Sequence, residues 1–412
     1  MPIPDTETAE ELFHQGYFSP PAAREALKQR QGGELLPSIF PLRGHVSLLK
    51  QSTSLSRAGY QHRNMDLQDW RVLQRDVLAV ARQADSRDGH RYKRTDIEIP
   101  DARPRGLLFV ASARMGRRVT ADRVHHYLGR GPVAMDFETP TGRFQLWRLP
   151  VLRVYWAARV DDFVGNFLVA FGAAMRQGDL LSEVRIDKGR LAAEALAVMK
   201  GFCVGASLGL LIVERINAVE ADAVTAAAVW ALLGQFTRST GIPVISMATP
   251  GAAAALMRHA DASGELTAAG TIIMNPPGAD AEEWENLCTF GYQEILGGNG
   301  RAPSWLVQDL AVATGTRMAL AHKCCRELAR HCGVSDENWD TRPANFDEVV
   351  KLALYVEQPG LKAAARLANG LQGFTVGSVK RYADWLMGKD APEIVPGLMV
   401  QSSDSHPAPL LN

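Results

Sequence analysis

The strongest constraint on how this chain can fold is a repeated alternation of short apolar runs with longer amphipathic stretches. Each apolar run is bounded by glycine, proline or polar residues and has the length of a buried strand. The runs lie at residues 106–111, 150–156, 208–213 and 242–247. The stretches around them predict helices at residues 72–83, 118–128, 162–176, 191–204 and 221–240. Strands that alternate with helices in this way predict an α/β fold, in which a parallel sheet is covered by helices on both faces.

The predicted strands occupy only the middle of the chain, and this divides it into four parts. Prolines punctuate residues 1–75, which we expect to form a helical arm that docks a partner. Residues 76–280 are the predicted α/β core. Strand signals stop after the core, so residues 281–390 predict a helical lid and the polar residues 391–412 a flexible tail.

Composition and the N-terminal residues indicate a protein of the cytoplasm. Lys and Arg together number 45, as do Asp and Glu, so the net charge is zero and an overall basic nucleic-acid binder is excluded. Five cysteines in 412 residues give no disulfide framework. The acidic N-terminus lacks the apolar region of a secretion signal. The apolar stretch 191–213 contains Glu194 and Lys200, which argues against a membrane span.

The turn after the first predicted strand is where a phosphate-binding loop would lie. Such a loop uses glycine main-chain N–H groups to hold phosphate, a lysine to neutralise it and a Ser or Thr hydroxyl to bind Mg²⁺. The eight positions from Ala111 to Arg118 retain only the second glycine of that pattern, Gly116. Arg117 takes the place of the lysine and Arg118 that of the hydroxyl. Taken by itself, an ordinary turn is the simpler explanation.

Three later motifs follow in the order that a nucleotide site would need. The third strand continues as LLIVERIN, which puts Glu214 at the position of a carboxylate that binds Mg²⁺. Arg215 stands where a glutamate would orient the attacking water. Thr249 follows the fourth strand, at the place of a polar sensor of the γ-phosphate, and Arg317 stands at the start of a lid helix. Together with the loop of residues 111–118, these make four weakened motifs in the correct order. The four motifs together predict a nucleotide site more strongly than any one of them alone.

With these motifs the chain resembles the TnsC/TniB-type AAA+ regulators of DNA transposition. The resemblance spans about residues 34–370 and is carried by LLPSIFPL, GHRYKR, LLIVERIN, FTRSTGIPVISMATPGAAAAL and GTRMALAHKCCREL. It implies an AAA+ P-loop-like core with a parallel sheet, a helical lid and a helical arm. It also implies that a nucleotide, where one is bound, contacts Gly116, Arg117, Arg118, Thr249 and Arg317, with Glu214 and Arg215 at the catalytic positions.

The departures from the family pattern predict a regulator without ATPase activity. Arg118 supplies no oxygen for Mg²⁺, and Arg215 cannot take over water activation, a role typically worth ~10²–10⁴ in rate. We therefore expect no catalytic residue, no metal and no cofactor. Two alternatives stay open, namely ATP with Mg²⁺ in an unusual site and a metal-free anion held by the arginines.

A basic stretch that runs through the first strand predicts contact with DNA. Residues 82–123 contain 11 Lys or Arg against 6 Asp or Glu, and Arg91, Lys93 and Arg94 surround an aromatic residue. This combination suits a phosphate backbone, although a solvated loop face explains it equally well. The resemblance favours DNA. It implies as partners target DNA, a transposase, a TniQ-like target-selection protein and further AAA+ subunits, either copies of this chain or paralogues, and no membrane.

The leading interpretation is an adaptor that bridges target DNA and transposase. Several other interpretations compete with it. They are another P-loop-like ATPase, an active AAA+ ATPase with an unusual site, and a structural subunit that joins an intact paralogue. Gly205–Gly209 fits the G-x-S-x-G string of a hydrolase, but a helix precedes it and a strand follows, the reverse of a nucleophile elbow. The cysteines and histidines of residues 322–332 lack the paired spacing of a zinc site, so buried cysteines are expected there.

Overall fold

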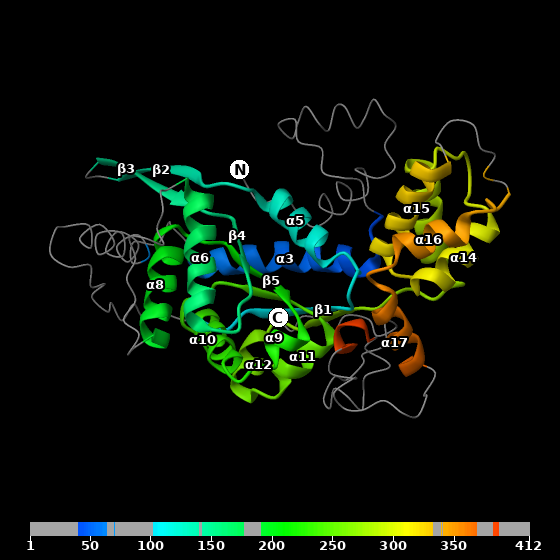
Figure 1. The fold of residues 1–412 in the computed structure, drawn as a ribbon. Helices are drawn as coiled ribbons and strands as arrows, with labels where there is room; N and C mark the ends of the chain where they lie inside the picture. Colours follow the sequence, from blue (N-terminus) through cyan, green and yellow to red (C-terminus); the bar gives the residue numbers. More distant parts are fainter. Residues whose placement is uncertain are drawn as a thin grey trace.

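A five-stranded parallel sheet forms the centre of the molecule (Figure 1). The computed structural model describes residues 40–63, 70, 102–139, 142–176, 191–332, 339, 341–368 and 382–386. The strand order is β4-β5-β6-β1-β7. Their bounds are Gly106–Ala111 for β1, Val151–Tyr155 for β4, Leu210–Ile216 for β5, Val244–Ala248 for β6 and Thr271–Met274 for β7. The predicted α/β fold, a parallel sheet covered by helices, is confirmed.

The position of β1 inside the sheet determines where a ligand site can lie. β1 is the first sheet strand in the chain, yet it pairs with β6 on one side and β7 on the other, which are the last two. The other strands therefore lie on both sides of it, and all carboxyl ends meet at one edge. In open α/β sheets, ligands bind in the crevice outside these carboxyl ends where the strand order reverses.

Helices cover both faces of the sheet because successive strand residues point to opposite sides. Leu108 and Val110 of β1 face one buried cluster, and Leu107 and Phe109 face the other. The first face is covered by α6 Val160–Met175, α8 Leu191–Gly205, α9 Ala218–Ala221, α10 Ala226–Thr240, α11 Pro250–Met257 and α12 Ala260–Leu266. The second face is covered by α3 Arg43–His62 and α5 Arg117–Leu128.

Helix α3 lies within the predicted N-terminal arm and packs directly on the sheet. Its Leu48 and Leu49 are buried in the same cluster as the second face of β1. Arg63, at its carboxyl end, is buried and donates a hydrogen bond to the Leu208 carbonyl oxygen just before β5. This helix therefore belongs to the second layer of the core.

In the part of the chain that the structure describes, five α-helices follow β7 and form a lid at one end of the sheet, drawn yellow to orange in Figure 1. They are α13 Glu282–Glu294, α14 Ser304–Thr314, α15 Met318–Cys332, α16 Phe346–Ala353 and α17 Gln358–Ala368, followed by the short 3₁₀ helix η2 Ala383–Trp385. The apolar residues of α13 to α16 continue the buried cluster of the second sheet face. In the described part of the chain, every helix is too short or too polar to cross a membrane.

The sequence missed three strands and misjudged one helix. A hairpin of β2 Val133–Thr139 and β3 Gly142–Arg148 forms a separate two-stranded sheet that projects from the body (Figure 1). Strand β7 has only four residues, which gives too short a pattern to detect. The helix predicted at 221–240 begins later, as α10 at Ala226, because the short helix α9 ends at Ala221 and a turn follows it. The predicted helix at 72–83 lies outside the described residues.

Candidate functional site

The loop of residues 112–116 connects the carboxyl end of β1 to α5 and lies at the centre of the candidate site. Gly116 begins α5 with a φ of 81°, and a Cβ at this position would lie 2.3 Å from the Cε atom of Met318 in the lid. Both the left-handed backbone and the close approach require glycine. The second glycine of the phosphate-loop pattern therefore has a structural explanation within this chain.

Neighbouring elements from both ends of the chain hold the loop in place. The Nε2 atom of His45, on α3, lies 3.1 Å from the Met115 carbonyl oxygen. The Leu42 N–H donates to the Nδ1 atom of the same ring at 3.1 Å, so His45 is neutral with its proton on Nε2. Burial lowers the pKa of His45 to about 4. From the lid, the N–H of Ala319 donates to the Arg114 carbonyl oxygen at 3.0 Å.

Arg117, at the lysine position, reaches across the carboxyl ends of two strands. Its Nη1 atom donates to the carbonyl oxygens of Ile216 on β5 at 3.1 Å and of Met247 on β6 at 3.3 Å. Burial lowers the pKa of Arg117 to about 10, opposed by the negative charge of Asp384. The guanidinium thus carries a full charge at neutral pH while it bridges the strand ends.

Glu214, at the position of the Mg²⁺-binding carboxylate, is buried in an ion pair. Its Oε1 accepts from Nε of Arg153 on β4, and its Oε2 accepts from Nη2 of the same arginine at 3.1 Å. The remaining Nη1 of Arg153 donates to Oδ1 of Asp122, on α5, at 2.6 Å. Arg153 therefore engages both Glu214 oxygens and ties β4, β5 and α5 together.

Arg215 points away from this network. It has a φ of 63° at an irregularity in the pairing of β5 with β6, and its guanidinium stacks on the Tyr155 ring at 3.8 Å from the centroid. Arg118 is likewise exposed, on the first turn of α5. Neither arginine occupies the centre of the carboxyl edge.

The two sensor positions also have partners within the protein. Thr249 is buried, and its hydroxyl oxygen accepts from the Ala252 N–H at 3.2 Å, so it caps the start of α11. Arg317 is buried at the start of α15 and donates from Nη2 to the Trp385 carbonyl oxygen at 2.6 Å. Burial lowers the pKa of Arg317 to about 10.

The structure thus gathers some of the predicted site residues, while it leaves Arg118 and Arg215 exposed. Gly116, Arg117, Glu214 and Arg317 lie around the carboxyl edge of the sheet. The predicted DNA-contact residues Arg91, Lys93 and Arg94 lie outside the described residues.

Several residues of this site were not predicted from the sequence. Of these, Arg153 left a signal, because it is the single charged residue of the predicted strand 150–156. His45, Asp122, Asp384 and Trp385 left none, since each lies in an ordinary polar or helical stretch.

The donor set around Glu214 does not suit Mg²⁺, which requires several oxygen ligands in near-octahedral geometry. Both Glu214 oxygens face Arg153, and the hydroxyl position holds Arg118. Among the described residues, no group of three or more His, Cys, Asp or Glu could hold a metal ion. Cys324 and Cys325 are buried in the lid, where burial raises the pKa of each thiol to about 12.

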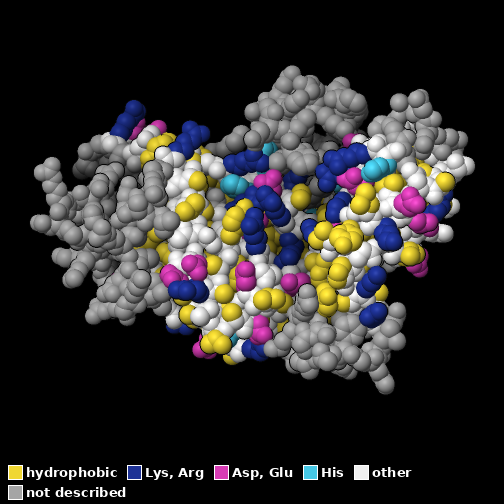
Figure 2. Space-filling view, in the orientation of Figure 1, with side chains coloured by type: hydrophobic (Ala, Val, Ile, Leu, Met, Phe, Trp, Pro, Cys, Tyr) yellow, Lys and Arg dark blue, Asp and Glu magenta, His cyan; other side chains and the backbone are white. Residues whose placement is uncertain are grey.

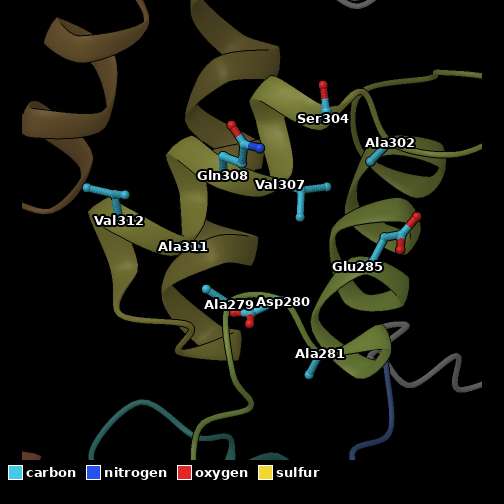
Figure 3. A pocket seen from close by; sticks show the side chains of 10 residues that line it. All are labelled: Ala279, Asp280, Ala281, Glu285, Ala302, Ser304, Val307, Gln308, Ala311 and Val312. Atoms are coloured by element: carbon cyan, nitrogen blue, oxygen red, sulfur yellow. The ribbon is translucent and has the colours of Figure 1, made fainter.

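Two cavities lie near the lid, and they differ in their relation to the loop. A cavity of about 260 Å³ is lined by Gly116 and by apolar residues of α13 to α15, with His322 and Arg326 at its polar side. A larger groove, of about 720 Å³, lies between the start of α13 and α14 (Figure 3). Its lining includes Val307, Ala311 and Val312 but none of the predicted site residues. The smaller cavity is therefore the one that adjoins the candidate site.

The hydrolase alternative has no support in the local geometry. Ser207 is buried, with a φ of 44°, between the end of α8 and the start of β5. A nucleophile elbow instead exposes its serine on a turn from a strand into a helix.

Comparison with known proteins finds likeness at the level of solved structures alone. No protein-family model matches the chain, and no curated protein does. A Walker-type ATPase of Pyrococcus abyssi is similar in structure, with a TM-score of 0.40 and 12% identity over 65% of this chain and 71% of that one.

Proposed function

We propose that this protein is an AAA+-like regulator of DNA transposition that acts as an adaptor at target DNA without hydrolysing ATP. The main support for a protein that does not hydrolyse ATP is the pairing of Glu214 with Arg153. This pairing leaves the proposed Mg²⁺-binding position without a free carboxylate. Arg117 is committed in addition to the carbonyl oxygens of β5 and β6. The sheet and lid would then serve assembly and the docking of partners.

Two chemical steps of ATP hydrolysis lack their usual groups in this chain. Mg²⁺ normally neutralises the charge that develops on the transferred phosphoryl group, and a positioned side chain orients the nucleophile. Arg118 offers no oxygen to the metal, and the exposed Arg215 stacks on Tyr155 instead of facing a water. Loss of the orienting group alone typically costs ~10²–10⁴ in rate.

Phosphate release from the purified protein, measured with and without DNA, tests this part of the proposal. We expect release at the background rate of the buffer. The matched control is Arg117→Ala, since activity from a contaminating ATPase would persist in that variant. A wild-type turnover near ~1 s⁻¹, the low end of ordinary enzyme rates, that disappears in Arg117→Ala would contradict the proposal.

Support for the DNA part comes from the sequence resemblance and from charge. The basic stretch 82–123 runs into β1 and α5. Figure 2 shows Lys and Arg side chains gathered across the middle of one face, over and beside α5. Such a gathering suits the sequence-independent binding of a phosphate backbone. The transposase and the target-selection protein are proposed as partners on the resemblance alone.

Replacement of Arg91, Lys93 and Arg94 by alanine tests the DNA contact. We expect weaker binding that is similar across DNA sequences, and a smaller dependence of affinity on salt, because fewer counterions are released. A matched triple control replaces exposed arginines elsewhere in the chain, namely Arg238, Arg301 and Arg330. Equal affinity and salt dependence in the test variant and the wild type would show that the stretch is only a solvated face.

A structural subunit that joins an intact AAA+ paralogue is the second candidate. The observation that favours it is a group of exposed apolar side chains around the end of α16, namely Leu352, Tyr355 and Val356. Exposed apolar groups of this kind suit a protein contact. DNA binding by the protein alone separates the two candidates, because the structural subunit would bind DNA only with its paralogue.

A further inference from the structure

A segment near the C-terminal end of the chain, Tyr382–Leu386, lies at the carboxyl edge of the sheet, beside the candidate site. Figure 1 shows it in red between α11 and α17. Ala383 and Leu386 are buried in the cluster of the first sheet face. Two glycines make room for it. A Cβ at Gly251 would lie 2.6 Å from the Cβ of Ala383, and one at Gly360 would lie 2.3 Å from the Trp385 ring. The segment is therefore closely packed against both core and lid.

Asp384 binds the loop through its main chain. Its carbonyl oxygen accepts a hydrogen bond from the N–H of Ala113, at 2.6 Å. Main-chain N–H groups of a loop in this position are the groups that hold phosphate in a P-loop. In this chain one of them is already occupied by an oxygen of the protein itself.

The side chain of Asp384 brings a negative charge to the same place. Its Oδ1 accepts from the N–H of Ala218, at 2.8 Å, at the start of α9 and two residues after the end of β5. The carboxylate also acts electrostatically on Arg117, raising the pKa of that guanidinium against the effect of burial. A single residue thus meets the loop, the end of β5 and the arginine at the lysine position.

Trp385 extends the contact to the lid. Its carbonyl oxygen accepts from Nη2 of Arg317 at 2.6 Å, and its ring lies under the same guanidinium at 5.4 Å from the centroid. The charge of a buried guanidinium needs such partners, since an uncompensated one is strongly destabilising. Arg317 begins α15, so this contact joins the lid to the carboxyl edge of the sheet.

We infer that Tyr382–Leu386 is an intramolecular substitute for nucleotide, with Asp384 and Trp385 occupying the phosphate position and clamping the lid to the core. One acidic segment contacts the loop, the end of β5 and the lid arginine, the three elements that a bound triphosphate would connect. The segment holds the closed arrangement without nucleotide, and a polyanion can enter only when the segment is displaced. The inference rests on the nucleotide-independent part of the proposed function and is separate from the DNA part.

Displacement of the segment has a measurable consequence for anion binding. When a site is accessible in only a fraction of the molecules, the apparent dissociation constant rises by the inverse of that fraction. A segment that is docked in most molecules therefore weakens the binding of any competing polyanion. Weakening its contacts should strengthen that binding by the same factor, because Arg117, Arg118 and Arg317 remain positively charged.

The test compares the full-length wild type with the double variant Asp384→Ala, Trp385→Ala. Inorganic tripolyphosphate without metal is the probe, and its binding is measured by calorimetry. Amide hydrogen exchange of the peptides that cover residues 112–118 and 315–322 is measured in parallel. We expect binding at least about tenfold tighter in the variant and about tenfold faster exchange in those peptides. Exchange in β5 and β6 should stay unchanged.

Two further variants keep the test decisive. Asp261→Ala with Trp147→Ala removes the same residue types from exposed places elsewhere and should behave as the wild type. Asp384→Asn keeps the size of the side chain while removing its charge, and, like the double variant, it leaves the carbonyl oxygen that accepts from Ala113 in place. It should show an intermediate gain in tripolyphosphate binding, and it stands in for the double variant if that does not fold.

The outcomes separate this inference from the proposed function. Tripolyphosphate affinity and loop exchange that are equal in the wild type, the double variant and Asp384→Asn would overturn the inference. Phosphate release by the wild type would overturn the proposed function, yet it would leave the comparison of exchange rates as it is.

Discussion

The interior of the sheet and its carboxyl edge are built in opposite ways from the same strands. In the interior, every residue of β1 and β6 is buried, and Ser246 is the one polar side chain in these two strands. At the edge, Arg117, Arg153 and Arg317 take positions that contact main-chain carbonyls or carboxylates of the protein. The difference teaches that apolar burial stabilises the interior of the sheet, while the charged side chains at its carboxyl edge are neutralised by groups of the chain itself.

The largest expected effect lies in the interior. Replacement of Phe109, which is fully buried in β1, by alanine removes apolar surface and leaves a cavity, so we expect a loss of about 3–5 kcal/mol in the free energy of unfolding. Denaturant unfolding measures it. The control Tyr355→Ala, at a side chain that is 77% exposed, should stay within about 0.5 kcal/mol of the wild type. Equal losses in both variants would remove the contrast between interior and surface.

The next prediction tests whether the ion pair between Arg153 and Glu214 stabilises the carboxyl edge of the sheet. Arg153→Leu leaves Glu214 buried without its partner, and we expect a loss of about 3 kcal/mol in unfolding free energy. Adding Glu214→Leu should recover most of that loss, because no unpaired carboxylate then remains in the interior. If the double variant is as unstable as the single one, the ion pair is not the reason for the effect.

A smaller effect on stability is expected at His45, which contacts the loop of residues 112–116 from α3. Its folded-state pKa of about 4 lies below the ordinary value of 6.5, so the unfolded chain binds the proton more readily. Stability should therefore be complete above pH 6.5 and fall as the pH is lowered toward 4. At pH 5 the loss from this residue is about 2 kcal/mol.

Unfolding curves of the wild type and His45→Gln between pH 7.5 and 5 measure this loss. The variant should lack the contribution of residue 45. The half-buried His125, whose pKa is also lowered to about 4, titrates in both proteins and cancels in the difference. Parallel curves for the two proteins would show that His45 does not link the loop to α3 in its neutral form.

Local patterns predicted much of the sheet. The run 106–111 was predicted as a strand and forms β1 with the same bounds, and β4, β5 and β6 lie within one to three residues of their predicted limits. They were visible because central parallel strands are apolar without interruption. β7 was missed because a four-residue edge strand carries almost no pattern. The β2–β3 hairpin was missed because it stands outside the main sheet and does not interrupt the alternation of strands and helices.

The sequence by itself determined the alternation of elements and the identity of the residues at the motif positions, because both are local properties of the chain. From it we predicted that Glu214 and Arg215 stand at the positions of an acidic pair. Only the tertiary structure decided what those residues contact. Arg153 and Glu214 are 61 residues apart in the chain, and Ala113 meets Asp384 through main-chain atoms that every residue possesses. Pairings of this kind depend on how strands and helices pack, so no short pattern encodes them.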